Sequence, residues 1–408
     1  MFKEKLVAKI AAILLMPLVF TSGMTSVFAE NAGGEAPDAL TFAEGNAVAT
    51  VATVKDTLAL DCKSAILMEA ATGAVLYEQN ADEALPPASV TKIMTLLLVM
   101  EAIDEGKIKL DDTVTASERA ASMGGSQIFL KVGEQMSVED MIKSVVISSA
   151  NDAACALAEF VSGSEEAFVR AMNVRAAELG MKNTSFENTN GLDDTAENHL
   201  TSARDIAIMS RELIKHKKIL EYSSIWMDSV RNGAFGLTNT NRLVRFYRGC
   251  TGLKTGSTSK AGFCVSATAE RDGMSLICVI MGSESRDIRN AQATKLLDWG
   301  FANYALYSHE GEKVEGIRLI GGVRDSVVGE YGGVFFVCEK GNASEIQSEI
   351  ALPDYVSAPV KRGDGIGEVV FTCDGKEIGR TPIRAAEDID KISFLGLWYR
   401  ILAKFALK

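Results

Sequence analysis

The sequence predicts a large α+β domain with an antiparallel sheet, followed by a small all-β domain and a terminal amphipathic helix. Three patterns carry this prediction. Strand-like runs lie near both ends of residues 62–310, whereas helical periodicity dominates the middle of that range. Short strand-like runs separated by turn signals fill residues 311–388. Residues 389–408 place apolar side chains on one helical face and basic side chains on another.

The local sequence accounts for each expected element. A Thr72-Gly73 turn between two apolar runs predicts a β-hairpin. Helical patterns then dominate from Ser89 to about Lys218. The other expected elements are strands at 262–269 and 274–281, a helix at 288–305, and strands at 314–320, 333–338 and 368–373.

Length and composition exclude several classes of protein. The 408 residues correspond to two or three domains, and 47% hydrophobic with 24% charged residues is typical of globular chains rather than disordered ones. The net charge of −12 argues against a nucleic-acid partner, which needs a basic face. The seven cysteines form no C-x-x-C pair and lie mostly in apolar runs, which favours free thiols but leaves a disulfide open.

Residues 1–29 are expected to be a secretory signal peptide. Lys3, Lys5 and Lys9 precede an uncharged apolar run, and a small residue, Ala29, stands at the predicted cleavage site. The apolar run is too short to span about 30 Å of hydrocarbon, so cleavage is favoured over a membrane anchor. The following residues, 30–61, lack periodicity and predict a flexible leader. The mature protein is therefore expected outside the cytoplasmic membrane.

The first chemical motif is Ser89-Val90-Thr91-Lys92, which follows two prolines and opens a strongly apolar helix. Because residues i and i+3 share a helix face, the Ser89 hydroxyl and the Lys92 amine are expected side by side. A serine nucleophile needs an adjacent base, and a desolvated lysine near a second cation can be that base. Taken alone, the spacing is commonplace and an ordinary helix start explains it.

The second motif is Ser149-Ala150-Asn151, in a break between two apolar helices. There Ser149 could relay a proton and Asn151 could donate to a substrate carbonyl. Helix capping is the alternative, and the motif alone favours it.

The third motif is Lys254-Thr255-Gly256, followed by Ser257 and Thr258 at the start of a predicted edge strand. Glycine in a strand often marks the close approach of another backbone. The lysine supplies positive charge, and Thr255 and Thr258 supply hydroxyls for an anionic carboxylate. A polar β-turn explains the motif equally well when it is taken alone.

In the order S-x-x-K, S-x-N and K-T-G, the three motifs are the signature of penicillin-recognising serine enzymes. The chain resembles the low-molecular-mass penicillin-binding proteins, which are serine-type D-Ala-D-Ala carboxypeptidases. The resemblance covers nearly all of the mature chain and implies a β-lactamase/transpeptidase-like catalytic domain. The other stretches that resemble the family are residues 87–95, 126–134, 188–192, 201–205 and 358–363.

The resemblance implies a role for each motif. Ser89 is expected to attack the penultimate D-Ala carbonyl of a peptidoglycan stem peptide while Lys92 takes its proton. Ser149, with Lys254 close by, is expected to pass a proton to the leaving D-alanine, and the N–H groups of Ser89 and Ser257 to hold the oxyanion. No cofactor or metal is implied, and β-lactam antibiotics are expected to react at Ser89. The remaining expected site residues are Asn151 for catalysis and Thr255, Gly256, Thr258 and Arg242 for substrate binding.

Two positions depart from the family pattern. Many members carry His directly after K-T-G, whereas this chain has Ser257. The backbone N–H at that position is retained, so the oxyanion hole is expected to survive with an altered substrate fit. Members usually hold the substrate carboxylate with an Asn-Arg pair, for which Asn241-Arg242 is the candidate, although the intervening loop looks longer.

Other functions are alternatives to the interpretation as a carboxypeptidase. A β-lactamase of class A needs a glutamate for deacylation, and Glu187 lies near the right distance, although it fits the family's N-x-x-G-L segment better. A DD-endopeptidase on the same fold and a non-catalytic wall-binding protein are further alternatives. A metalloenzyme is disfavoured because His199, His216 and His309 have no ligand spacing.

Residues 389–408 are expected to form a helix that lies in a membrane interface. Its polar face carries Arg400, Lys404 and Lys408 in an otherwise acidic protein. The alternative is an ordinary amphipathic helix packed on the all-β domain. The basic bias favours peripheral attachment to the outer face of the cytoplasmic membrane. The expected apolar face comprises Phe394, Leu395, Trp398, Ile401, Leu402 and Phe405.

Overall fold

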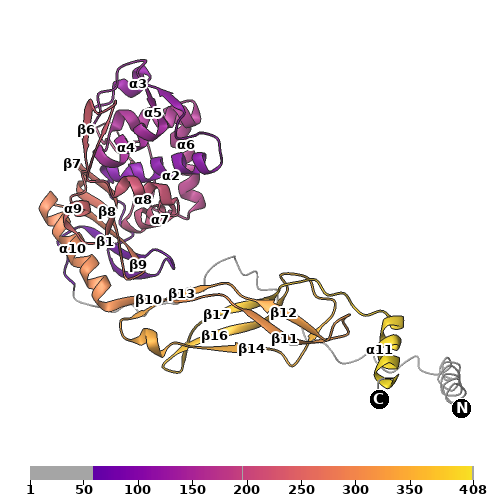
Figure 1. Cartoon of the computed structure of the whole chain (residues 1–408). Helices are drawn as coiled ribbons and strands as arrows, with labels where there is room; N and C mark the ends of the chain where they lie inside the picture. Colours follow the sequence, from indigo (N-terminus) through magenta and orange to yellow (C-terminus); the bar gives the residue numbers. More distant parts are fainter. Residues whose placement is uncertain (1–57, 195, 407–408) are drawn as a thin grey trace, which may run out of the picture. The chain divides into compact units, whose positions relative to one another are not determined.

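The computed structural model describes residues 58–194 and 196–406 (Figure 1). The predicted signal peptide, nearly all of the predicted leader, and Lys408 lie outside the described residues. Among the described residues all seven cysteines are free thiols, and no helix is long and apolar enough to cross a membrane.

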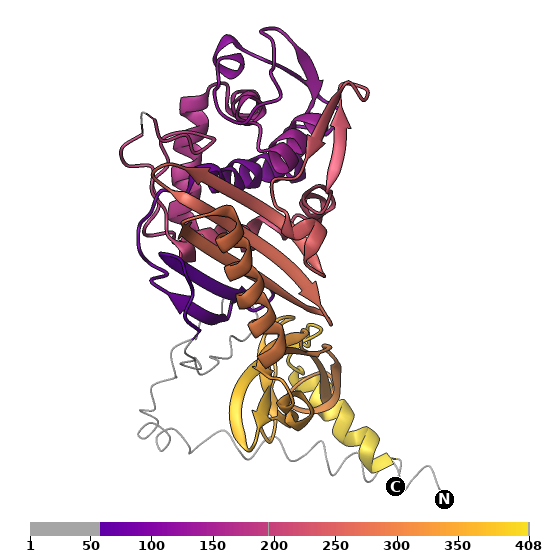
Figure 2. The same cartoon turned by 90° about the vertical axis from the view of Figure 1, so that its left-hand side faces the viewer.

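A five-stranded antiparallel sheet forms the centre of the larger domain (Figure 2). The hairpin and the two later strands predicted from the sequence are all present. The strand that carries the K-T-G motif is at the edge of the sheet, as expected. The order across the sheet is β2 (Val75–Gln79), β1 (Ser64–Glu69), β9 (Met274–Ser283), β8 (Gly262–Arg271) and β7 (Cys250–Thr258).

Helices cover both faces of this sheet. Alternate side chains of β9 point to opposite faces. Ile277 and Val279 belong to one apolar core with the helical cluster, which includes α7 (Ala203–Leu213). Leu276 and Cys278 belong to a second core with α10 (Arg286–Asn303). The near-continuous apolar sequence of β9 follows from burial on both faces.

The helical cluster surrounds α2 (Lys92–Asp104), which is buried over most of its surface. The break between α4 and α5 brings the second motif beside this helix. Serine side chains accept the backbone N–H three residues later at the starts of α4, α6, α7 and α10, so the sequence marks these helix boundaries clearly. The remaining elements are η2 (Ala88–Thr91), β3 (Thr113–Thr115), α3 (Glu118–Ala121), β4 (Gln135–Ser137), α4 (Val138–Ser148), α5 (Asn151–Ser162), α6 (Glu165–Glu178), α8 (Lys217–Ser223), β5 (Met227–Val230), β6 (Phe235–Thr238) and α9 (Leu243–Phe246).

The smaller domain is almost entirely β-structure around an apolar core that includes Phe336, Val369 and Phe371. One pair, β10 with β13, stands beside a six-stranded sheet of order β14-β16-β17-β12-β11-β15. Only the short β11–β15 pair is parallel. The strands are β10 (Tyr304–His309), β11 (Lys313–Ile320), β12 (Ser326–Glu330), β13 (Val334–Glu339), β14 (Gln347–Ala351), β15 (Val356–Ser357), β16 (Gly365–Cys373) and β17 (Lys376–Ala385), with η3 (Asn342–Glu345) between β13 and β14.

Two element boundaries differ from the sequence expectation. The chain is already strand at Tyr304, where the predicted helix still ran, because β10 pairs with β13 of the smaller domain. The terminal helix α11 (Phe394–Ala406) begins later than residue 389. Ile389 is buried in the core of the smaller domain and bridges Val360, which keeps the preceding segment extended.

Candidate active site

The S-x-x-K motif places its two polar side chains in contact. Ser89 lies in the 3-10 turn η2, and Lys92 is the first residue of α2. Lys92 Nζ is 2.8 Å from Ser89 Oγ and 2.7 Å from the carbonyl oxygen of Asn190. Lys92 is fully buried, and this burial together with the charge of Lys254 holds its pKa well below 10.5. A lysine in this state can accept a proton from the adjacent hydroxyl.

The backbone around Ser89 is strained and tightly packed. Ala88 has a φ of +49°, a left-handed conformation that a non-glycine residue adopts only at a cost. On the other side, β7 passes so close that a Cβ atom on Gly256 would lie 2.8 Å from Ser89 N. Glycine is therefore required at position 256 for the strand to approach Ser89, which explains the glycine of K-T-G.

The S-x-N and K-T-G motifs meet through Ser149 and Lys254. Ser149 ends α4 in a left-handed conformation, with φ of +62°, and α5 starts two residues later. Its hydroxyl accepts a hydrogen bond from Lys254 Nζ at 2.9 Å. Burial and the nearby charge of Arg289 lower the pKa of Lys254 to about 7. At neutral pH this pair can therefore both give and take a proton.

Asn151 contributes an unpaired acceptor to the site. Its side-chain nitrogen donates to the carbonyl oxygen of Gly124 at 2.7 Å. Its Oδ1 atom is buried and has no hydrogen-bond partner among the described residues. From the sequence we expect the nitrogen to donate to the substrate, whereas in this geometry the oxygen is available for a substrate N–H.

The predicted substrate-binding residues near the end of β7 differ in their contacts. Thr255 is buried beside Lys254 and its hydroxyl donates to Thr240, whereas Ser257 is exposed. The Thr258 hydroxyl instead donates to the carboxylate of Asp193, which ties the end of β7 to the loop that follows Asn190. Thr258 therefore contacts the protein rather than presenting a free hydroxyl.

Arg242 is not in contact with the motif residues. Its guanidinium is half-exposed, lies 3.7 Å from Asp287 and faces the ring of Phe246. The other candidate from the alternatives, Glu187, is exposed, and its carboxylate accepts the N–H of Asn198. The structure does not bring Glu187 to Ser89, the position that a deacylating glutamate would need.

Three residues support the site without having been predicted. Asp152 is buried and its carboxylate accepts the N–H groups of Ile128 and Leu130, which fixes the loop before β4. Asn190 acts through its backbone carbonyl, so its side-chain type carried no signal. Arg289 on α10 is buried and donates to the carbonyl of Cys264, the strand partner of Gly256. An isolated arginine on an amphipathic helix gave no motif to find.

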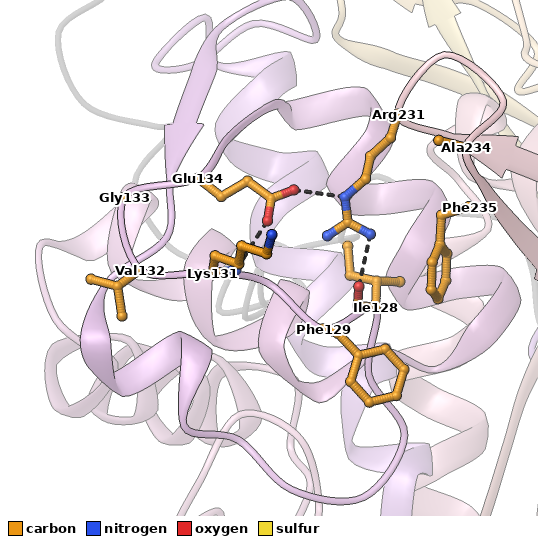
Figure 3. A pocket seen from close by; sticks show the side chains of 9 residues that line it. All are labelled: Ile128, Phe129, Lys131, Val132, Gly133, Glu134, Arg231, Ala234 and Phe235. Atoms are coloured by element: carbon orange, nitrogen blue, oxygen red, sulfur yellow. Dashed lines mark hydrogen bonds and ion pairs between the residues drawn. The ribbon is translucent and has the colours of Figure 1, made fainter.

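A pocket of about 620 Å³ borders this region (Figure 3). Its walls are the loop before β4 and the tip of the β5–β6 hairpin. Arg231 joins the walls, since it donates to the carboxylate of Glu134 at 2.6 Å and to the carbonyl of Ile128 at 2.8 Å. Phe129, 65% exposed, meets Phe235 edge to face. The motif residues do not line this pocket, which lies next to the catalytic cluster rather than around it.

Two family models match the sequence that forms this arrangement of two buried lysines on two serines. The family model described as D-alanyl-D-alanine carboxypeptidase matches residues 49–285, and that of the penicillin-binding protein 5 C-terminal domain matches residues 304–391. The chain belongs to the D-alanyl-D-alanine carboxypeptidase family.

Individual relatives agree with this assignment. The D-alanyl-D-alanine carboxypeptidase DacF of Bacillus subtilis is 44% identical over 345 residues, which is 83% of this chain and 88% of the relative. Penicillin-binding protein 5 of Haemophilus influenzae superposes with a TM-score of 0.73 at 33% identity, over 82% of this chain and 98% of that one. Penicillin-binding protein D2 of Listeria monocytogenes, solved in an ampicillin-bound form, has a TM-score of 0.56 and 32% identity over 60% of this chain and all of that one.

These findings confirm the fold, the family and the enzyme class that the motifs predicted. The protein is a serine-type D-Ala-D-Ala carboxypeptidase, a hydrolase of the low-molecular-mass penicillin-binding protein class. No finding favours the β-lactamase, endopeptidase or wall-binding alternatives over it.

Proposed function

We propose that this enzyme removes the terminal D-Ala from peptidoglycan stem pentapeptides through an acyl-enzyme on Ser89. The 2.8 Å contact between Ser89 Oγ and a fully buried Lys92 carries the proposal. Lys92 takes the hydroxyl proton as Ser89 Oγ bonds to the penultimate D-Ala carbonyl carbon. The N–H groups of Ser89 and Ser257 stabilise the resulting oxyanion, which is the charge that develops in the transition state.

The leaving D-alanine needs a proton when the peptide C–N bond breaks. Lys254 and Ser149, in contact at 2.9 Å, form the path that supplies it. Because the pKa of Lys254 is about 7, its ammonium is a competent acid at the pH of the wall. Water then attacks the acyl-enzyme, and Ser89 regains its proton as the shortened stem peptide leaves.

The substrate carboxylate requires a positive potential at the K-T-G strand. Lys254 and the buried guanidinium of Arg289 supply this potential, whereas the Thr255 hydroxyl donates its proton to Thr240. Arg242 contributes less, because it is half-exposed and paired with Asp287. The arrangement therefore favours substrates that end in a free carboxylate, as the carboxypeptidase reaction demands.

Reaction with β-lactam antibiotics follows from the same chemistry, because the lactam carbonyl takes the place of the D-Ala carbonyl. The ampicillin-bound Listeria relative supports this part of the proposal. The adduct is expected to persist, since Glu187 is exposed and bonded to Asn198 instead of activating a water at Ser89. Persistence distinguishes a penicillin-binding protein from a β-lactamase.

The enzyme is proposed to act outside the cytoplasm, attached to the outer face of the cytoplasmic membrane through α11. The signal-peptide pattern of residues 1–29 supports export. The apolar face of α11 is largely uncovered, with Phe394, Leu395 and Phe405 each more than 70% exposed. Such a face is unfavourable in water, and a lipid interface with anionic headgroups would cover it and attract the basic side chains.

The decisive experiment compares three substrates with the purified enzyme. A soluble pentapeptide ending in D-Ala-D-Ala should release free D-alanine, measured by mass spectrometry of both products. A cross-linked dimer of stem peptides should be cleaved far more slowly. Preferential cleavage of the cross-link would establish the endopeptidase alternative instead, and rapid turnover of penicillin without a stable adduct would establish the β-lactamase.

A further inference from the structure

The strained turn before the nucleophile is held by a chain of hydrogen bonds that starts at Thr91. The carbonyl oxygen of Ala88 accepts from Thr91 Oγ1 at 2.8 Å. Thr91 Oγ1 is in turn 2.7 Å from His199 Nε2, and both residues are buried. A hydroxyl has one proton, and here Thr91 donates it to Ala88, so the hydrogen of the second contact must come from the histidine.

The other ring nitrogen fixes the protonation state of His199. His199 Nδ1 accepts the backbone N–H of Glu187 at 2.9 Å, so it carries no proton. The pattern is therefore satisfied by one species, the neutral imidazole with hydrogen on Nε2. Donation runs in a single direction, from Glu187 through His199 and Thr91 to the carbonyl of Ala88.

This chain joins the two backbone segments that define the catalytic pair. Glu187 begins the loop whose Asn190 carbonyl holds Lys92 Nζ. The same loop approaches the nucleophile turn so closely that a Cβ atom on Gly191 would lie 1.8 Å from the oxygen of Ala88. His199 bridges the loop to the turn that carries Ser89, and it touches neither reacting atom.

We propose that neutral His199 is a positioning residue, which holds the Ser89 turn and the Lys92-binding loop in the geometry that acylation needs. The inference concerns the acylation step and so rests on the proposed function. A displacement of about 1 Å between nucleophile and base can cost about 10²-fold in rate, which is the scale of effect expected from loss of the bridge.

The surroundings of His199 keep it neutral under working conditions. Burial lowers its pKa to about 4, and the positive charge of Lys92 on α2 acts in the same direction. Asp193 on the loop raises the pKa, and the Glu187 carboxylate is turned to Asn198. On α6, Glu165 is bonded to Thr189 and Arg119. Protonation at Nδ1 would set an N–H against the N–H of Glu187 and break the bridge.

Two substitutions of His199 separate its hydrogen bond to Thr91 from its hydrogen bond to Glu187. His199→Gln can place its amide nitrogen where Nε2 donates to Thr91, but His199→Asn is shorter and can only accept from Glu187. We expect His199→Asn to lower the second-order rate constant of acylation by a fluorescent penicillin about 30- to 100-fold. We expect His199→Gln to stay within about fivefold of wild type. Thr91→Val should match His199→Asn, and adding it to that variant should cost little more.

The pH profile tests the protonation state. Below the pKa of Lys92, acylation should fall about tenfold per pH unit as the base is protonated. In wild type the fall should steepen near pH 4, where His199 gains its proton as well, and in His199→Gln it should not. Nitrogen NMR of labelled histidine should report the neutral Nε2–H tautomer at pH 6. His216→Gln is the matched control, because His216 pairs with Asp104 at the far end of α2.

The outcomes are distinct from failure of the proposed function, in which wild type itself would form no adduct. Wild-type acylation rates in both His199→Asn and Thr91→Val would overturn the inference, as would an Nδ1–H tautomer. If the acylation rate decreases identically at acid pH in wild type and in His199→Gln, a group other than His199 titrates there, which contradicts the assignment of this step to His199. If His199→Asn lowers thermal stability but not acylation, His199 is only a packing residue and the inference is wrong.

Discussion

The two domains differ in whether they bury polar side chains. Within the described residues, the larger domain buries lysines, carboxylates, amides, hydroxyls and the guanidinium of Arg289. From Tyr304 onward the buried side chains are apolar or tyrosine, and charged residues stay at the surface. Burial of a charge costs free energy that packing alone would not require. This difference indicates that the catalytic reaction takes place in the larger domain and that the smaller domain has a structural role.

The buried polar groups of the larger domain are also connected. Lys92 contacts Ser89 and the Asn190 carbonyl, and Lys254 contacts Ser149. The proposed reaction explains why such groups are retained at the expense of stability, because it needs a neutral lysine next to a serine. The comparison predicts that substitutions in this network change activity, whereas those in the β-domain core change stability alone.

The largest effect is expected for Ser89→Ala, which removes the proposed nucleophile. Release of D-alanine from a soluble pentapeptide should fall by more than about 10³-fold. Intact-mass analysis should detect one penicilloyl group on wild type and none on the variant. An adduct of unchanged mass on Ser89→Ala would place the nucleophile elsewhere and remove the basis of the proposed mechanism.

The next largest effect is expected for Lys92→Arg, because an arginine keeps the charge but cannot act as a base. Acylation is expected to fall about 10²- to 10⁴-fold, measured by stopped-flow with a fluorescent penicillin. Lys92→Met is the matched control for charge, since it fits the apolar surroundings yet also lacks a base. If either variant acylates near the wild-type rate, Lys92 is not the general base.

In the β-domain, Phe371→Ala should cost about 3–5 kcal/mol of stability by leaving a cavity in a fully buried position. Because no catalytic group lies in this core, kcat on a soluble pentapeptide should be unchanged below the unfolding transition. Ile350→Ala, on a side chain 47% exposed, is the control and should cost under about 1 kcal/mol. A parallel loss of kcat in Phe371→Ala would contradict the division of roles.

Lys254→Met should make the protein inactive and more stable, by about 1–3 kcal/mol at pH 7. The folded-state pKa of Lys254 is about 7 and its ordinary value is 10.5, so the unfolded chain binds more protons between these pH values. The contribution of Lys254 to the free energy of unfolding of the wild type therefore rises as pH increases from about 7 to 10.5. The advantage of the variant should be largest at or below pH 7 and shrink toward pH 10, as measured by urea unfolding. An advantage that grows with pH would contradict the assigned pKa direction.

The sequence predicts the strands and motif contacts of the larger domain because local signals and global fold agree there. Serine caps, the buried pattern of β9 and the i,i+3 spacing of Ser89 and Lys92 each act over short distances. Features that depend on tertiary contact are not predictable in this way. The carbonyl of Asn190 has no side-chain signature, and the bridge of Ile389 to Val360, together with the burial of Ile389 in the β-domain core, overrides its helical pattern.

The smallest effect on activity is expected from removal of α11, which would separate the location of the enzyme from its catalysis. A chain ending at Ser393 keeps Ile389 in the β-domain core and the bridge of Lys391 to Gly322. It loses two contacts of Arg400, a hydrogen bond to the carbonyl of Val323 and an ion pair with Asp325 that contributes about 0–1 kcal/mol.

We therefore expect this shortened chain to match the full mature protein in thermal stability and in kcat on a soluble pentapeptide. It should no longer co-sediment with vesicles that contain anionic lipid, because the exposed aromatic side chains of α11 and its cations are gone. A chain ending at Asp388 should in contrast be less stable, since Ile389 is removed from its buried site. Vesicle binding by the chain ending at Ser393 at the level of the full protein would show that α11 is not the attachment. Loss of β-domain stability in that chain would show that α11 packs on the domain as a structural helix.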